Sequence, residues 1–454
     1  MAAKKSHTMD MVNGPIFKNV IKFSVPLMIT TLLQMCFNTA DTIVVGRFAG
    51  DNALAAVGAT ASLCFLMVTM FNGLAMGANV VIAKFFGAKD DENVSKAVHT
   101  SMTLSVISGI ILTAAGLLLA KPLLMAMSTP KSIIDLSVLY LRIYFSGAIF
   151  FLVYNFGAAV LRSKGDTRRP VFYLSVSGVL NIILNLIFVI VFHMGVAGVA
   201  LATTISNALS SVLVVLTLFR ETDATKLHLG KLGLDKSMSI EILRIGIPAG
   251  IQQAMFALSN LVIQSSINSF DSSVIVAGNS AASNIETFVY VGMNFSSATM
   301  TFISQNIGAG NYKSIKKITA ITMLLNAGVA FLLGFIVWSF DEQLLGLYTS
   351  SADSEQVIAV GIVRIAWVVF FLWLNAIMDV FIASLRGMGI STTPTVTMII
   401  CICGLRLLWL FTVFPMHRTI ETIYYCFPIS WAVSSVVLGL MWWIAYRKLM
   451  RSVA

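Results

Sequence analysis

The sequence PLMITTLLQMCFNTAD, which runs from Pro26 to Asp41, lies within the first long apolar segment of the chain. Its polar residues recur at steps of four, four and three, so a helix holds on one face the residues Thr30, Gln34, Asn38 and Asp41. An ionised carboxylate inside a membrane-length apolar helix is costly, so it normally faces a partner or a wet cavity. The stretch therefore predicts a transmembrane helix with a functional polar face, and Asp41 is the first candidate site residue.

The composition extends this prediction to the whole chain. Of the 454 residues, 57% are hydrophobic and only 11% are charged, and the mean hydropathy is +0.88. A soluble domain has about 25% charged residues. A helix needs about 20 apolar residues to cross a bilayer, so twelve crossings with short loops use almost the entire chain. We therefore expect an all-α polytopic membrane protein with twelve transmembrane helices and no separate soluble domain.

Twelve apolar segments are long enough for these crossings. We expect them at residues 16–45, 53–85, 98–120, 136–161, 170–192, 195–219, 240–267, 274–303, 315–338, 357–385, 394–414 and 420–446. With the N-terminus inside, most of the 30 Lys and Arg residues lie on the inner side, and only four lie on the outer side: Arg47, Lys121, Lys131 and Arg418. The positive-inside rule then places both termini in the cytoplasm. The net charge of +10 is explained by this topology and does not indicate a nucleic-acid partner.

The two halves of the chain resemble each other. IKFSVP at residues 21–26 matches LRIGIP at 243–248, and LRSKGDTRRP at 161–170 matches LRGMGISTTP at 385–394. Two halves with six helices each, in the same order, predict a parallel repeat about an axis along the membrane normal. We expect an N-lobe at residues 1–220, a cytoplasmic linker at 221–239 and a C-lobe at 240–454, with a transported ligand between two similar lobes.

Further polar side chains lie inside the predicted spans. Glu286 is part of a polar face in the eighth span, and in the tenth span Asn375 precedes Asp379 by one turn. A third polar face in the fifth span includes Asn181 and Asn185. Polar side chains in membranes often hydrogen-bond between helices, so a structural role stays open beside a functional one for each face.

Arg406 is a charged residue of the eleventh span. Counted by helical rise, it lies at about the same depth in the membrane as Glu286. This predicts an ion pair between Glu286 and Arg406, which would make Glu286 mainly structural; the alternative is that the two residues are charges of the cavity.

Enzyme motifs are missing from the sequence. It contains no G-x-x-x-x-G-K-[ST] loop for ATP and no G-x-S-x-G elbow, and its five histidines have no metal-ligand spacing. A channel is disfavoured because no re-entrant, filter-like motif is present. We therefore expect a secondary transporter that is not an enzyme and that binds no metal and no cofactor other than a coupling ion.

Several motifs of this sequence occur in the same order in a known family. They are a proline in the first helix of each half (Pro26 and Pro248), Asn38-x-x-Asp41, QNIGAG at 305–310 after the eighth helix, and Leu-Arg-x-x-Gly at Leu161 and Leu385. In these features nearly all of the chain resembles the multidrug and toxic compound extrusion (MATE) transporters.

The resemblance implies a fold and a function. It implies a twelve-helix bilobed fold of the multidrug, oligosaccharidyl-lipid and polysaccharide exporter superfamily, located in the bacterial cytoplasmic membrane. It also implies multidrug efflux by antiport, in which organic cations leave in exchange for H⁺ or Na⁺. The acid of the first helix, matched here by Asp41, would take part in cation coupling.

The coupling ion stays open because neither family pattern is complete. Proton-coupled members have an Asn on the fifth helix followed one turn later by Asp, and here Asn181 is followed by Asn185 instead. Sodium-coupled members have acids on the seventh and tenth helices. The seventh helix here has no acid, and the tenth has Asp379 one turn from the matching position. The candidate cation-coupling residues are therefore Asp41, Asn38, Asn181, Asn185 and Asp379.

We expect a mechanism in which a cationic substrate and the coupling ion compete for Asp41. Protonation or ion binding would weaken the attraction for the substrate and reshape the first helix near Pro26, which with Pro248 is a candidate hinge. The candidate substrate-binding residues are Gln34, Asp41, Asn155, Gln252, Asn260, Glu286 and Asn375. The many Met and Phe residues could line an adaptable cavity.

Two alternatives to cation export stay open. The same superfamily fold would suit a flippase of a lipid-linked or other amphipathic metabolite, which should have a cationic cavity. A receptor without flux is the third reading. A monomer suffices for each of these functions, because one chain already supplies two lobes.

Overall fold

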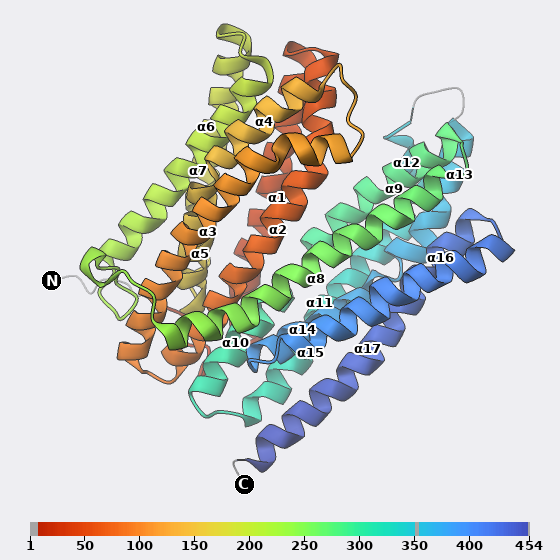
Figure 1. Ribbon diagram of the computed structural model, residues 1–454. Helices are drawn as coiled ribbons and strands as arrows, with labels where there is room; N and C mark the ends of the chain where they lie inside the picture. The colour runs from red at the N-terminus through yellow and green to blue at the C-terminus, as the bar shows by residue number, and fades with distance from the viewer. Residues whose placement is uncertain (1–7, 350–353, 453–454) are drawn as a thin grey trace. The chain divides into compact units, whose positions relative to one another are not determined.

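The computed structural model describes residues 8–349 and 354–452, and within these residues it contains helices and no strand (Figure 1). The helices of the first half of the chain are α1 (Ile16–Phe48), α2 (Asp51–Gly87), α3 (Asp91–Ala126), α4 (Ile134–Ser146), α5 (Ala148–Ser163), α6 (Arg168–Leu186), the π-helix η1 (Ile187–Val191), α7 (Gly195–Arg220) and the 3₁₀ turn η2 (Leu229–Lys231). Those of the second half are α8 (Lys236–Asn268), α9 (Ser273–Val291), α10 (Phe295–Gly308), α11 (Lys313–Ser339), α12 (Asp341–Gly346), α13 (Ser354–Arg364), the π-helix η3 (Ile365–Val369), α14 (Leu372–Gly387), α15 (Thr392–Met398), the π-helix η4 (Ile399–Gly404), α16 (Leu405–Met416) and α17 (Ile420–Arg451).

The predicted fold class, an all-α polytopic membrane protein, is confirmed. Among the described residues, 10 helices are long and apolar enough to cross a membrane, and α4 with α5, which are bent by 44° at their junction, can form an eleventh span. Each of the twelve predicted ranges coincides with a helix or with consecutive helices. The predicted span at residues 274–303 is not among these eleven, because residues 292–294 separate α9 from α10. Polar residues such as Asn279 and Glu286 lower the hydropathy of α9.

Large apolar side chains cover much of the molecular surface, while many polar side chains are buried. Leu118 is 75% exposed and Phe411 is 74% exposed, whereas Asn326 and Ser206 lie in the interior. Exposed apolar surface of this extent is typical of a protein that contacts lipid.

The chain forms two compact units that do not coincide with its sequence halves. The first unit comprises Ile29–Gly250 and the described residues up to Asp10, and the second comprises Met11–Met28 and Ile251–Ala454. The chain thus passes from one unit to the other inside α1 and again inside α8. The lobe boundaries at residues 220 and 240 stay a prediction.

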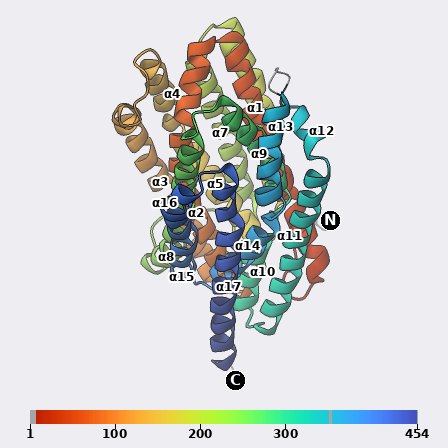
Figure 2. The ribbon, with the colours of Figure 1, turned by 90° about the vertical axis from the view of Figure 1, so that its right-hand side faces the viewer.

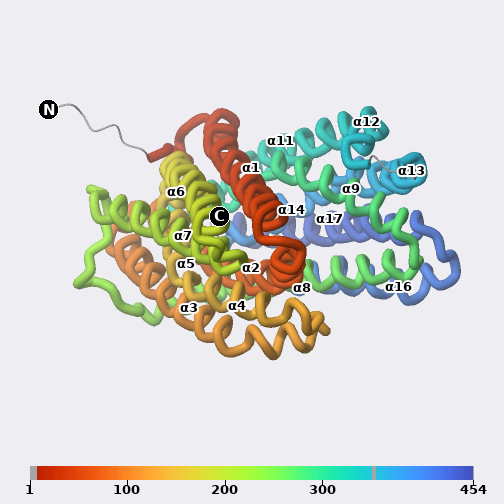
Figure 3. Tube along the Cα trace, turned by 90° about the horizontal axis from the view of Figure 1, so that it is seen from above, coloured from red at the N-terminus to blue at the C-terminus, as the bar shows by residue number. Residues whose placement is uncertain are grey.

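In the first unit, α3 packs against α5, α4 and α2, and α5 also packs against α7. α6 lies beside α7, as Figures 1 and 3 show. The apolar core between α3, α4 and α5 includes Leu112, Leu124, Leu141, Phe145 and Leu152.

The first unit also contains a close approach of two helix backbones. Gly73 and Gly77 of α2 face Gly246 and Gly250 of α8, so each helix has two glycines four residues apart. A Cβ added at Gly77 would lie 2.3 Å from the Ile242 carbonyl oxygen, and one at Gly73 would lie 2.3 Å from the Gly250 nitrogen. Glycines at this spacing let helix backbones in membranes approach each other closely, which strengthens van der Waals contact.

In the second unit, α14 packs against α11, α10 and α17 (Figures 1 and 2). The N-terminal residues of this unit are held by contacts with α10. Asn306 Nδ2 donates to the Met11 carbonyl oxygen at 3.0 Å, and the rings of Phe23 and Phe302 meet edge to face at 5.9 Å.

Candidate functional site

Asp41 on α1 is joined to α6 and α7 by a chain of hydrogen bonds within the first unit. Asn185 Nδ2 donates to Asp41 Oδ1 and, at 3.2 Å, to Asn181 Oδ1. Asn181 Nδ2 in turn donates to Thr203 Oγ1 at 3.4 Å. The polar faces predicted on the first and fifth spans therefore meet at Asp41. We call these four residues the Asp41 cluster.

The Asp41 cluster has unused acceptor atoms. Asn185 is fully buried, and its Oδ1 has no hydrogen-bond partner among the described residues. None of the ion pairs within residues 8–349 and 354–452 includes Asp41. A partly buried carboxylate without a protein cation, next to an unused amide oxygen, is suited to receive a proton, a metal cation or an organic cation.

Two other predicted residues of α1 lie apart from this chain of hydrogen bonds. Gln34 and Asn38 are exposed, and in the described part of the chain neither side chain hydrogen-bonds to the Asp41 cluster. Two tyrosines that we did not predict lie within electrostatic reach of Asp41. They are Tyr140 and Tyr144 of α4, whose rings stack at 6.0 Å. Their one-turn spacing was the available signal, but it also suits ordinary packing.

A second polar cluster lies in the second unit and has Arg364 at its centre. Arg364 Nη2 donates to Glu286 Oε2 at 2.5 Å and Nε donates to the same oxygen at 3.2 Å. Its Nη1 donates to Asn279 Oδ1 at 2.6 Å, and this oxygen also accepts the Tyr424 hydroxyl at 3.0 Å. Every guanidinium nitrogen of Arg364 therefore has an acceptor among these residues. We call Arg364, Glu286, Asn279 and Tyr424 the Arg364 cluster.

The predicted ion pair of Glu286 with Arg406 is wrong, because Arg364 is the partner of Glu286. Equal depth was the argument for Arg406, but depth does not fix the direction in which a side chain leaves its helix. Arg406 instead donates from Nε to Ser430 Oγ at 3.1 Å and lies over the ring of Phe427, with 4.3 Å between the guanidinium carbon and the ring centroid. It is 2% exposed.

The other candidates of the second unit are not gathered into one site. Asn375 is buried and Asp379 is partly buried on α14. Gln252 on α8 accepts a hydrogen bond from Arg386 Nη2 at 2.7 Å. Within the described residues, no hydrogen bond joins Gln252, Asn375 or Asp379 to the Arg364 cluster.

Two predicted substrate-binding residues have little contact with the polar clusters. Asn155 of the first unit donates to the Phe151 carbonyl oxygen of its own helix at 2.8 Å. Asn260 of the second unit is exposed on α8. Each of these two residues therefore offers a polar group to a ligand but is not part of either polar cluster.

The two candidate hinge prolines lie inside long helices. Pro26 is within α1 and Pro248 is within α8. Pro26 lies two residues before Met28, where α1 passes from the second unit to the first. Pro248 lies two residues before Gly250, where α8 passes from the first unit to the second. A proline ring clashes with the preceding turn and bends a helix. A bend at Pro26 or Pro248 would therefore lie close to the point where the helix passes from one unit to the other.

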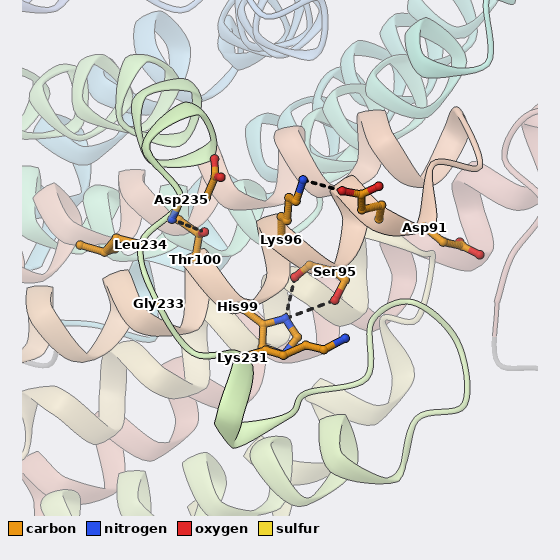
Figure 4. A pocket seen from close by; sticks show the side chains of 10 residues that line it. Asp91, Ser95, Lys96, His99, Thr100, Lys231, Gly233, Leu234 and Asp235 are labelled. Atoms are coloured by element: carbon orange, nitrogen blue, oxygen red, sulfur yellow. Dashed lines mark hydrogen bonds and ion pairs between the residues drawn. The ribbon is translucent and has the colours of Figure 1, made fainter.

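A polar pocket of about 630 Å³ lies in the first unit between the start of α3 and residues 231–235 (Figure 4). His99 on its wall contacts the Ser95 carbonyl oxygen through Nδ1 at 2.6 Å and accepts the backbone N–H of His228 at Nε2 at 3.0 Å. The hydrogen bond at Nε2 makes Nδ1 the protonated nitrogen. Among the described residues no group of three or more His, Cys, Asp or Glu side chains is placed to hold a metal ion.

Comparison with known proteins decides between the classes of function. Residues 26–187 and 248–412 match the family model MatE. The chain belongs to the MatE family. The probable multidrug resistance protein YoeA of Bacillus subtilis (strain 168) is 27% identical to this MATE chain over 446 residues, with 95% of each chain covered. The probable multidrug resistance protein NorM of Thermotoga maritima is 27% identical over 399 residues, which cover 86% of this chain and 84% of NorM.

The fold of the MATE chain also agrees with a solved structure. A crystal structure of MATE in complex with MaL6 superposes with a TM-score of 0.91 at 22% identity and covers 99% of this chain and 100% of that chain. Members of the MATE family are transporters, so this chain is a transporter and not an enzyme. The polar clusters are therefore candidate sites for ions and substrates and not for catalysis.

Proposed function

We propose that this MATE transporter exports amphipathic organic cations across the bacterial cytoplasmic membrane in exchange for H⁺ or Na⁺. Its relatives in Bacillus subtilis and Thermotoga maritima are named as probable multidrug resistance proteins. The observation that carries the proposal is the Asp41 cluster, in which a carboxylate without a protein cation is held by Asn185.

The amide of Asn185 lets the cluster respond to the charge of Asp41. When Asp41 is ionised, Asn185 donates to the carboxylate through Nδ2. When Asp41 is protonated, its hydroxyl needs an acceptor, and a rotation of the amide would present the unused Oδ1 of Asn185. The two protonation states thus favour two amide orientations, and the change also affects the hydrogen bond to Asn181.

Na⁺ is the other coupling ion that the cluster suits. Hard cations bind carboxylate, amide and hydroxyl oxygens, and the cluster offers these on Asp41, Asn185, Asn181 and Thr203. Asp379 of the second unit is a further carboxylate for ion coupling.

Exchange would follow from alternate occupancy of Asp41. An organic cation is attracted by the ionised carboxylate, and an incoming proton or Na⁺ removes that attraction. The coupling ion shifts the conformational equilibrium only if it binds one state better than the other. We assign this difference to bending of α1 at Pro26 and of α8 at Pro248, since both helices pass between the two units. A monomer with both termini in the cytoplasm suffices for this cycle.

The test is efflux of the organic cation rhodamine 6G from proteoliposomes, with H⁺ and Na⁺ gradients imposed separately. We expect one gradient to drive efflux in the wild type and Asp41→Asn to lower the driven rate at least tenfold, on the order of one lost charge–charge contact. The matched control is Asp135→Asn, because Asp135 is an exposed carboxylate on α4, and its efflux should equal that of the wild type.

Two results would contradict the proposal. Undiminished gradient-driven efflux by Asp41→Asn would remove Asp41 from coupling and direct attention to Asp379. No cation flux in the wild type, combined with movement of a labelled anionic lipid between leaflets, would favour a flippase instead.

A further inference from the structure

The charges buried in the second unit do not pair completely. Glu286 is taken by Arg364, with two hydrogen bonds to one carboxylate oxygen. Arg406 is equally buried but is in none of the ion pairs of the described residues. We infer that Arg406 is a binding group for the anionic part of amphipathic substrates, namely a carboxylate or a phosphate. This inference rests on the proposed export function and extends its substrates beyond simple cations.

The two arginines differ in how many of their donors are used. All three guanidinium nitrogens of Arg364 donate to Glu286 or Asn279. Arg406 donates from Nε alone, at 3.1 Å to Ser430 Oγ. Its two Nη atoms carry four N–H groups, and no atom of the described residues accepts a hydrogen bond from them. One N–H of each Nη atom lies on the outer edge of the guanidinium, and these two N–H groups can bind a carboxylate or phosphate with two parallel hydrogen bonds.

The surroundings of Arg406 hold its guanidinium in place. Ser430 binds one edge, and the rings of Phe427 and Trp431 lie 4.3 Å and 5.8 Å from the guanidinium carbon. Ser430 in turn donates to the Phe427 carbonyl oxygen at 2.9 Å, so its oxygen is oriented as an acceptor for Nε. A guanidinium fixed at one edge and on its aromatic face loses little freedom when a ligand binds the other edge.

A purely structural role does not account for this arrangement. The residue as a whole is 2% exposed, and neither Nη atom is among the fully enclosed polar atoms without a partner in the described residues, so both reach open space. A cation held at such a position carries a desolvation penalty that an apolar side chain of similar size would avoid. An anion repays this penalty through charge-assisted hydrogen bonds. The aromatic rings alone offer an attraction of only about 2 kcal/mol when desolvated.

The depth of Arg406 limits what the anion can be. It lies ten residues before Met416, the last residue of α16, which corresponds to about 15 Å along the helix. The head group of a resting lipid does not reach this depth in a hydrocarbon layer about 30 Å thick. We therefore assign the anion to a molecule that passes through the protein. Phe427 and Trp431 favour a ligand with an aromatic or apolar body beside its charge.

The experiment compares two dyes that differ only at a carboxyl group. Rhodamine B carries a free carboxylate, and its ethyl ester does not. Binding of both to the purified full chain in neutral detergent is measured by fluorescence polarisation. We expect Arg406→Gln to weaken rhodamine B binding at least tenfold and to change ester binding less than about twofold, because only the acid uses the guanidinium. Arg406→Lys should restore part of the lost rhodamine B affinity, since lysine keeps the positive charge but cannot donate two parallel hydrogen bonds.

Controls separate this site from general effects. Arg418→Gln removes one cation at an exposed position and should leave both affinities unchanged. Ester binding by Arg406→Gln shows that the variant is folded. Dioctanoyl phosphatidic acid is a competitor with a phosphate: its displacement of rhodamine B from the wild type but not of the ester supports the same site with a phosphate ligand.

Two outcomes would overturn the inference. Equal weakening of both dyes by Arg406→Gln would make Arg406 structural, and a wild type that binds the ester but not rhodamine B would exclude an anion site. Both leave the export of cations intact. In contrast, absence of rhodamine 6G efflux from the proteoliposomes counts against the proposed function itself.

Discussion

Replacing Arg364 by glutamine would leave the Glu286 carboxylate buried without its cation. Arg364 makes three hydrogen bonds to Glu286 and Asn279 at 2.5–3.2 Å. Breaking a buried ion pair from one side costs about 3–5 kcal/mol, and glutamine can restore one neutral hydrogen bond of about 1 kcal/mol. We therefore expect a loss of about 2–4 kcal/mol in the free energy of unfolding. The assay is SDS-induced unfolding in mixed micelles, followed by circular dichroism.

The double variant Arg364→Gln with Glu286→Gln tests the pairing itself. It has no unpaired charge, so its loss should be smaller than the sum of the two single losses by about 2 kcal/mol. Arg406→Gln with Glu286→Gln is the matched control, and its losses should depart from additivity by clearly less than those of Arg364→Gln with Glu286→Gln, because Arg406 makes no hydrogen bond to Glu286. Two results would refute the assignment of Arg364 as the partner of Glu286. One is that the losses of unfolding free energy by Arg364→Gln and Glu286→Gln add in the double variant. The other is that each single loss is below about 0.5 kcal/mol.

Two further predictions concern the first unit. Gly77→Val should lower the free energy of unfolding in the same SDS assay, because its Cβ would lie 2.3 Å from the Ile242 carbonyl oxygen. Gly58→Val is the control and should lower it far less, since nothing lies within 4 Å of a Cβ at Gly58. Equal effects of the two substitutions would contradict the close approach of α2 and α8. Desolvation and then the charges of Lys226 and Lys231 lower the pKa of His228 below its ordinary value of 6.5, so the folded state favours the neutral ring and loses stability as the pH falls below about 6.5. Hydrogen exchange of residues 224–232, corrected for its intrinsic rate, should therefore lose protection between pH 7 and pH 5.5, and constant protection would contradict this.

Sequence reasoning worked best where helical periodicity was regular. The spacing of polar residues on the first and fifth spans predicted two faces, and the structure joins them through Asp41 and Asn185. The span positions followed from apolar length alone, because a bilayer demands long apolar helices. The break between α9 and α10 was missed, since Asn294, within the break, continues the spacing of four residues from Glu286 to Tyr290.

The partner of Glu286 could not be predicted by counting residues along ideal helices. The π-helix η3 (Ile365–Val369) directly follows Arg364, and the π-helix η4 (Ile399–Gly404) ends two residues before Arg406. A π-helical turn contains more residues than an α-helical one, so it rotates the side chains that follow relative to those before it. Depth along the membrane survives such a change, but direction around the helix does not. A comparison by depth alone could therefore place Arg406 at the height of Glu286 but could not identify the partner.

The passage of α1 from one unit to the other affects the order in which a ribosome can complete the fold. Met11–Met28 are synthesised first, yet their contacts through Asn306 and Phe302 require residues made almost 300 positions later. The first unit can gather its helices as soon as Gly250 has left the ribosome, whereas the second must take up a segment that entered the membrane at the start of translation. The N-terminal segment must therefore wait during synthesis, and a chain that stops at the linker would leave it without its native partners.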